Sequence, residues 1–209
     1  MKFVDIENWN RKTTFEFFRD YEDPFFNITA NLDGSELYRF CKENKLSFAL
    51  ANLFYSLQAA NAIKEFRYRL KDKNVVEFEK VHATQTILSD DETFSFGYFE
   101  NQETVFEFNG AGKIAVKKYK ALKSFDVEND RLDLIYYSVI PWISFTSFKH
   151  ATRFNNRQTV PRMVFGKLFE EADGKKKLPH SVEVHHALCD GLHVGKYFNL
   201  LQEKFDNPY

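Results

Sequence analysis

The chain has 209 residues, and its 29 basic and 30 acidic side chains leave a net charge of -1. This length corresponds to one domain, and the balanced charge excludes a global field that would recruit nucleic acid or an anionic membrane surface. Aromatic residues make up 17% of the chain, with 24 Phe among them. So much flat apolar surface belongs in a core, a subunit interface or a ligand pocket.

The first half of the chain alternates between helical and strand patterns. Phenylalanines spaced among charges predict a short amphipathic helix over residues 10–20, and alternation predicts a strand over 25–33. A turn at 33–35 opens a second helix, and Ser47 caps a longer, buried helix that runs to about residue 63. Four strands are predicted next, over residues 67–70, 75–80, 83–88 and 93–100.

The second half begins with a helix over residues 101–124, and a helix over residues 192–206 closes the chain. Four strands are predicted between them, over residues 132–140, 142–149, 161–171 and 181–186, with an exposed hairpin tip at 173–174. The chain contains no repeat and no linker-like tract. We therefore expect a single α+β domain over residues 1–209, a two-layer sandwich whose mixed sheet carries helices on one side.

The cysteine content and the start of the chain indicate the compartment. Cys41 and Cys189 are too few for a disulfide framework, and no apolar signal-peptide core follows Met1. No stretch approaches the roughly 18 unbroken apolar residues of a membrane helix. We expect a soluble, reduced, cytoplasmic protein with neither nucleic acid nor membrane as a partner.

The densest polar cluster lies near the C-terminus, where four of the six histidines fall within fourteen residues: His180, His185, His186 and His193. Imidazole titrates near neutrality, so a histidine at a strand end facing a cleft is a candidate general base. Alternation in strand 181–186 sends His185 and His186 to opposite faces, so one can be catalytic while the other is packed. A lone histidine is more often a satisfied core or turn residue.

Two other chemistries stay open for this cluster. Histidine, cysteine and aspartate are all zinc ligands, but neighbouring His185 and His186 point apart and the usual ligand spacings of zinc sites are missing. Cys189 as a nucleophile would need an exposed thiolate in an electropositive niche. The adjacent Asp190 disfavours that thiolate. No metal site is predicted.

The run His185-His186-Ala187-Leu188-Cys189-Asp190-Gly191 matches the HHxxxDG signature of CoA-dependent acyltransferases. The wider sequence resembles the type A chloramphenicol acetyltransferases, in order, spacing and total length. The further matching segments are residues 9–12 (WNRK), 15–18 (FEFF), 81–82 (VH), 92–95 (ETFS), 138–148 (SVIPWISFTSF) and 193–195 (HVG). Condensation domains of peptide synthetases share the signature but are about twice as long. The acyltransferase cores of 2-oxo acid dehydrogenases resemble the fold but carry a DHR-type motif.

The resemblance implies an O-acetyltransferase that uses acetyl-CoA as co-substrate, with no bound cofactor, and confers antibiotic resistance. In the family the second histidine, here His186, removes the proton from the primary hydroxyl of chloramphenicol as that oxygen attacks the thioester directly. A serine hydroxyl, here Ser138, stabilises the tetrahedral oxyanion. Without the Pro-Trp context, Ser138 would be an ordinary strand serine.

The resemblance also implies supporting and binding residues. The family pairs the signature aspartate, here Asp190, with an N-terminal arginine, here Arg11, as structural support of the site. Phe17, Phe18 and Phe94 fall where family members contact the antibiotic, although each is as well explained by core packing. The family is a homotrimer with active sites between subunits, so a homotrimer is expected here.

Four positions depart from the family pattern. Glu183 replaces a glutamine and Leu192 an aromatic residue of the signature, while Val164 replaces a threonine and Leu168 a tyrosine. These changes leave His186 in place. They keep two alternatives open: an acyltransferase of the same fold that acts on another small alcohol or amine, and a non-catalytic trimeric binding protein.

Overall fold

The structure is a computed structural model that describes residues 1–122, 131–152 and 158–209. Its main feature is a seven-stranded mixed sheet with the order β2-β10-β8-β7-β5-β6, in which β9 pairs with β10 beside this path. Strands β5, β7 and β8 run parallel to one another, and the remaining pairs are antiparallel. The strands are β2 (Phe25–Asp33), β5 (His82–Leu88), β6 (Phe94–Phe99), β7 (Leu134–Val139), β8 (Arg162–Phe165), β9 (Phe169–Glu170) and β10 (Lys176–His185).

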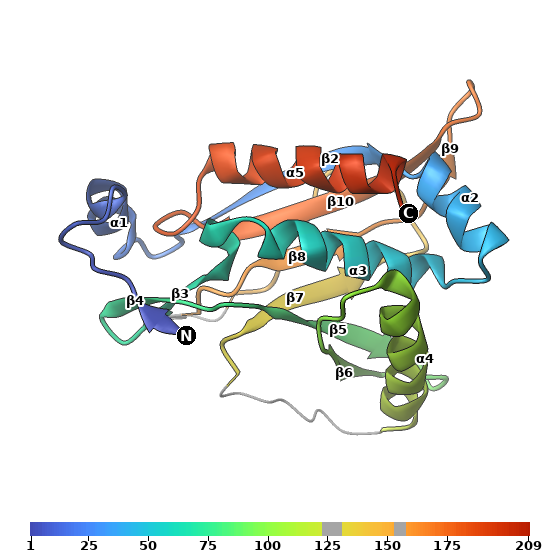
Figure 1. Cartoon of the computed structure of the whole chain (residues 1–209), viewed down its shortest axis with the longest axis horizontal. Coiled ribbons are helices and arrows are strands. Elements are labelled where there is room, and N and C mark those ends of the chain that lie inside the picture. The colour runs from blue at the N-terminus through green and yellow to red at the C-terminus, as the bar shows by residue number, and fades with distance from the viewer. Residues whose placement is uncertain (123–130, 153–157) are drawn as a thin grey trace.

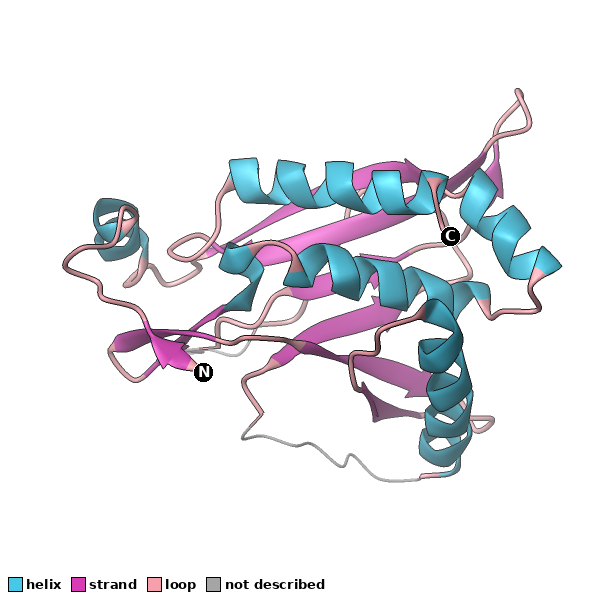
Figure 2. Ribbon diagram, viewed as in Figure 1, coloured by secondary structure: helices cyan, strands magenta, loops and turns pink. Residues whose placement is uncertain are grey.

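Four helices cover one face of this sheet (Figures 1 and 2). They are α2 (Ser35–Glu43), α3 (Phe48–Asn61), α4 (Val105–Ala121) and α5 (Gly191–Asp206). The core lies between the two layers, where Leu53 and Leu57 of α3 and Val182 of β10 are fully buried. The expected α+β sandwich with helices on one side is confirmed. No helix within the described ranges is long and apolar enough to cross a membrane.

A smaller sheet and a short helix lie at one end of the sandwich (Figure 1). The sheet has the order β1-β4-β3. Its elements are β1 (Lys2–Phe3), the 3-10 turn η1 (Lys64–Arg67), β3 (Tyr68–Lys71) and β4 (Asn74–Glu77), and the helix is α1 (Lys12–Phe18). Phe15 of α1 and Tyr68 of β3 form a second apolar cluster with Ala187 and Leu188, which follow β10. The N-terminal segment is thereby packed against the residues that carry the histidine pair.

Local sequence signals explain where the helices begin. The Ser47 side chain accepts the Leu50 amide, as the predicted cap requires. Thr104 and Glu107 form a reciprocal capping box at the start of α4. Gly112 allows α4 to approach α3 closely, because a β-carbon there would lie 2.8 Å from Leu50 Cδ2.

One strand prediction is wrong, and a second is wrong in part. Residues 142–149 form no strand, because the chain turns after Ile140, although the Ile143 carbonyl accepts the amide of Lys167 (2.9 Å), which lies between β8 and β9. The strand predicted over 161–171 is split into β8 and β9. Gly166 marks the break, because a β-carbon there would lie 3.0 Å from the Phe145 ring. The last two residues of the helix predicted over 101–124 lie outside the described residues.

His180 belongs to a buried hydrogen-bonded chain. One ring nitrogen, Nδ1, lies 3.1 Å from the Val164 carbonyl, and Nε2 lies 2.8 Å from the Tyr197 hydroxyl. That hydroxyl continues to Ser56 and from there to Tyr137. Burial lowers the pKa of His180 to about 3. The ring is therefore neutral and ties α5 and α3 to the central strands.

Arg69 joins the small sheet to the large one. It is fully buried, and its guanidinium donates to the carbonyls of Phe66, Tyr68, Leu132 and Leu134 at 2.6–2.9 Å. Burial lowers the pKa of Arg69 to about 9, because the loss of water around the charge outweighs the opposing electrostatic effects of Tyr136 and Asp133. Four backbone oxygens therefore depend on one side chain.

Replacing Arg69 with methionine is expected to lower the free energy of unfolding by about 3–5 kcal/mol, because buried carbonyls lose their donor. Urea unfolding at a fixed protein concentration measures this loss. Arg39→Met is the control, since Arg39 is exposed on α2, where it pairs with Glu36 and Glu43, and its loss should cost under about 1 kcal/mol. Equal unfolding midpoints for the two variants would contradict this role of Arg69.

Candidate active site

His186 lies directly after the last residue of β10, and aromatic rings hold its side chain. Its imidazole stacks flat on Phe18, with ring centres 3.9 Å apart and planes 4° apart. Phe26 approaches the same ring at 4.7 Å. His185, by contrast, meets Phe25 edge to face. Because Phe25 and Phe26 alternate along β2, the two histidines lie on opposite sides of the strand end, as alternation predicts.

The two nitrogens of the His186 ring differ in their surroundings. Nδ1 is buried and has no hydrogen-bond partner among the described residues. Nε2 is therefore the nitrogen left to meet a substrate. A ring that takes up a proton at Nε2 carries its own proton on Nδ1, and here no acceptor fixes that proton. The stacking contact with Phe18 thus sets the orientation of the ring.

The backbone of His186 is held from two sides. Its amide donates to the Pro24 carbonyl (2.8 Å), and its carbonyl accepts from Arg11 Nη2 (3.5 Å). The other terminal nitrogen of Arg11 donates to Asp190 Oδ2 at 2.5 Å. The two residues predicted to pair are thus in contact, and we call this ion pair the clasp. Their supporting role stays a prediction.

The electrostatics of the clasp favour the charged form of Asp190. The Arg11 side chain is 9% exposed and that of Asp190 31% exposed. Burial raises the pKa of Asp190, but the hydrogen bond from Arg11 and the charges of His193 and Arg11 outweigh it, so the pKa lies below its ordinary value. Asp190 Oδ1 also accepts the Leu192 amide and caps α5. The clasp therefore fixes the turn between His186 and α5.

Ser138 lies far from His186 within the chain. It is in β7, beside Val164 of β8, which in turn is beside Ser181 of β10. His186 is five residues beyond Ser181, so two strand spacings and five residues of rise separate Ser138 and His186 by about 19 Å. Neither side chain can span such a distance. One copy of the chain does not bring the predicted base and the predicted oxyanion donor together.

Ser138 shares a face of the sheet with Phe94. Tyr137 points to the helices, where its hydroxyl bonds Ser56. Side chains alternate along a strand, so its neighbour Ser138 points to the opposite face of the sheet, which the four helices leave uncovered and which we call the bare face. Ser95 likewise points to the helices, where it bonds the Tyr119 carbonyl, so Phe94 also points to the bare face. Phe94 is 43% exposed on the edge strand β6, four strands from β10.

The two other predicted binding residues, Phe17 and Phe18, lie on the histidine side. Phe17 is 62% exposed and meets Phe18 edge to face at 4.9 Å. The predicted site is therefore present in two halves. Phe17, Phe18 and His186 form one half, while Ser138 and Phe94 form the other.

The remaining polar groups of the histidine cluster are buried. Burial, with the neighbouring His186 charge, lowers the pKa of His185 to about 4. Burial raises the pKa of the Cys189 thiol well above its ordinary value, so this thiol does not provide a thiolate nucleophile. In the part of the chain that the structure describes, no three His, Cys, Asp or Glu side chains are grouped to hold a metal ion.

The departures from the family pattern have distinct surroundings. Glu183 pairs with Arg162 (2.8 Å), and both are almost fully buried. Burial raises the pKa of Glu183, but hydrogen bonding and charge from His150 and the charge of Arg162 outweigh it and hold the pKa below its ordinary value. Val164 is buried directly beside Ser138. Sequence reasoning found the change at Glu183 but missed Arg162, its compensating charge.

The other two departures differ in their exposure. Leu192 is 64% exposed at the first turn of α5. Leu168 is half-buried and packs against the core near Gly34.

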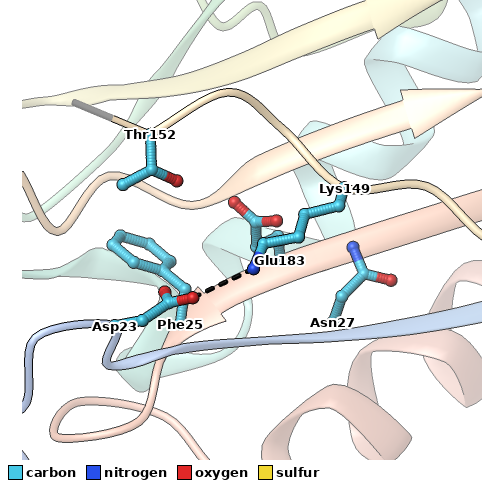
Figure 3. A pocket seen from close by; sticks show the side chains of 6 residues that line it. All are labelled: Asp23, Phe25, Asn27, Lys149, Thr152 and Glu183. Atoms are coloured by element: carbon cyan, nitrogen blue, oxygen red, sulfur yellow. Dashed lines mark hydrogen bonds and ion pairs between the residues drawn. The ribbon is translucent and has the colours of Figure 1, made fainter. Parts of the chain in front are cut away.

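Figure 3 shows a pocket of about 180 Å³ beside β2 and β10 on the bare face of the sheet. An ion pair between Lys149 and Asp23 (3.0 Å) spans it, and the buried Glu183 carboxylate lies at its wall. The full lining is Asp23, Phe25, Asn27, Lys149, Thr152 and Glu183. None of the predicted site residues lines it, and the composition of these separate segments contained no signal for it.

The sequence is similar to those of known proteins. A family model described as chloramphenicol acetyltransferase matches residues 1–202. The chain is 32% identical to a chloramphenicol acetyltransferase of Klebsiella sp. over 204 residues, 97% of this chain and 93% of that protein. It is also 32% identical to a chloramphenicol acetyltransferase of Clostridium perfringens over 212 residues, 99% of this chain and 96% of that protein.

Solved structures agree with the sequence comparisons. A chloramphenicol acetyltransferase superposes with a TM-score of 0.90 at 26% identity, covering 97% of this chain and 98% of the other. A dihydrolipoamide acetyltransferase of Azotobacter vinelandii superposes with a TM-score of 0.73 at 13% identity, over 100% of this chain and 91% of the other. The second similarity shows the shared fold alone.

Replacing Arg11 with lysine tests the clasp. Lysine keeps the charge but cannot reach both Asp190 and the His186 carbonyl, so we expect a loss of about 1–2 kcal/mol in the free energy of unfolding. Thermal and urea unfolding measure it. The neighbouring Lys12→Ala removes an exposed pair with Glu7 and should change stability by under about 0.5 kcal/mol. Unchanged stability of Arg11→Lys would show that the second contact is dispensable.

Proposed function

The chain belongs to the chloramphenicol acetyltransferase family and is an acyltransferase, and we propose that it transfers the acetyl group of acetyl-CoA to the primary hydroxyl of chloramphenicol. One observation carries the assignment of the base. The His186 imidazole is clamped by aromatic rings and by its backbone contacts, while Nε2 is left to meet a hydroxyl. A base held this way suits proton removal from an alcohol.

The proposed reaction is one direct transfer. As the hydroxyl oxygen forms a bond to the thioester carbonyl carbon, His186 Nε2 takes the hydroxyl proton. The resulting tetrahedral oxyanion accepts a hydrogen bond from Ser138, and such a donor is worth up to about 3–4 kcal/mol. The carbon-sulfur bond then breaks, and the departing CoA sulfur takes the proton back from His186. The products are the acetyl ester and free CoA.

The separation of His186 and Ser138 supports a site made by two subunits. A single chain keeps them about 19 Å apart at opposite ends of the sheet. Ser138 must therefore act together with the histidine of another copy. A closed ring of copies repeats this contact at every interface. We propose a homotrimer in which His186 with Phe18 faces Ser138 and Phe94 of its neighbour.

The exposed aromatic side chains of both halves suit the proposed acceptor. Phe17 and Phe94 present flat apolar surface, which matches a nitrophenyl ring and excludes water from the reacting groups. Cys41 and Cys189 are both free and buried, which suits a reducing cytoplasm. The proposed location is therefore the cytoplasm, which is also the location expected from the sequence.

His186→Ala is expected to lower kcat by at least about 10²–10⁴-fold, because the proton acceptor is lost. Release of free CoA from acetyl-CoA, with and without chloramphenicol, measures the rate. His82→Gln is the matched control, since that histidine pairs with Glu100 away from the site and should leave the rate within about twofold. Full acetyl transfer by His186→Ala would show that another group is the base. Wild-type turnover with other small alcohols but not with chloramphenicol would show that the acceptor is a different alcohol.

Mixing two inactive variants tests the shared site. His186→Ala and Ser138→Ala subunits, unfolded and refolded together in equal amounts, should regain about a quarter of the wild-type activity, because random mixing pairs an intact histidine with an intact serine at a quarter of the interfaces. Each variant refolded alone is the control. A mixture no more active than its separate components would contradict a site made by two subunits.

A further inference from the structure

A second pair of titratable side chains lies behind the clasp and takes no part in the proposed chemistry. His193 is in the first turn of α5, and its Nδ1 accepts the backbone amide of Asp190 at 3.1 Å. The same nitrogen lies 3.0 Å from Asp190 Oδ1. On its other side, Nε2 lies 3.4 Å from a carboxylate oxygen of Glu65 in η1. Both His193 and the Glu65 carboxylate are mostly buried.

These contacts select one form of the His193 ring. An amide can only donate, so Nδ1 must carry a lone pair toward Asp190. The proton of the neutral ring is then on Nε2, which faces the Glu65 carboxylate at 3.4 Å. The charges that face the ring are those of Glu65, Asp190, Arg11 and Lys196. Burial lowers the pKa of His193, and the two carboxylates offset it only in part.

The contacts continue in one direction toward the active site. Glu65 orients His193, His193 holds Asp190, and Asp190 pairs with Arg11. Arg11 in turn donates to the carbonyl of His186. The last connection of this series is the backbone of the proposed base. A shift of Asp190 would therefore displace the imidazole against Phe18.

We propose that His193, oriented by Glu65, is a positioning residue for acetyl transfer. It keeps the clasp in contact with the backbone of His186. This inference rests on the proposed function. It requires more of residue 193 than a helix cap does. A cap needs only an acceptor for the Asp190 amide, whereas the positioning role needs that acceptor together with a donor toward Glu65.

Three substitutions separate these two roles. In His193→Gln the amide oxygen can accept from Asp190 while its nitrogen donates to Glu65, so kcat should stay within about threefold of wild type. His193→Glu supplies an excellent capping acceptor but no donor, and it sets a carboxylate against Glu65. His193→Ala supplies neither. Since small misplacements of reacting groups cost up to about a hundredfold, both should lower kcat by about 10–100-fold, with smaller changes in KM.

A reciprocal change provides the rescue. In the double variant His193→Glu with Glu65→Gln, the new amide can donate to the new carboxylate, so kcat should recover at least about fivefold over His193→Glu alone. Glu65→Gln alone is the control and should stay near wild type, because its amide oxygen can still accept from Nε2. Circular dichroism and oligomeric mass establish that each variant is folded and assembled.

The outcomes fall into clear classes. Acceptor-dependent CoA release that is high in wild type and His193→Gln, low in His193→Ala and His193→Glu, and restored in the double variant supports the positioning role. Equal kcat in His193→Gln and His193→Glu overturns it, because residue 193 would then act as a cap alone. Equal kcat in wild type and His193→Ala overturns it as well. No turnover by wild type with any acceptor overturns the proposed function, and the inference falls with it.

Discussion

The ion pair between Arg11 and Asp190 is the interaction on which the proposed arrangement of the site depends. It connects residues 179 positions apart in the sequence, so it cannot form until both ends of the chain are in place. Its carboxylate also caps α5, and its guanidinium also reaches the backbone of His186. One planar cation therefore aligns a helix start, a strand end and the N-terminal segment together.

The sheet imposes the second constraint. Strand spacing is fixed by hydrogen bonding, so residues placed at opposite ends of a sheet cannot be brought together by side-chain movement. His186 and Ser138 have this relation, and the helices leave the face that carries Ser138 uncovered. An enzyme built on one layer of helices thus has a free sheet face on which a second copy can supply what the first lacks. In the proposed homotrimer, catalysis and assembly would depend on the same surface.

Much of this could be predicted from the sequence, and the limits have physical causes. Periodicity located the helices well because their apolar faces are wide, and the His-His pair was placed correctly at the end of a strand. Residues 142–149 alternate like a strand yet form none, since pairing depends on where the chain runs after Pro141. Arg162, the charge that compensates Glu183, comes from another strand, and register decides that contact. The contact between Glu65 and His193 likewise could not be predicted without the fold.

The position of β10 in the sheet has a consequence for how the protein is made. Among the described residues, strand β2 is at the edge of the sheet and pairs with β10, which the ribosome synthesises about 140 residues later. Until then both edges of a nine-residue strand carry unpaired amides and carbonyls. The large sheet therefore closes only after β10 has been synthesised. A nascent chain that stalls before β10 exposes a template for intermolecular strand pairing, so the synthesis of β10 decides whether β2 is protected from aggregation.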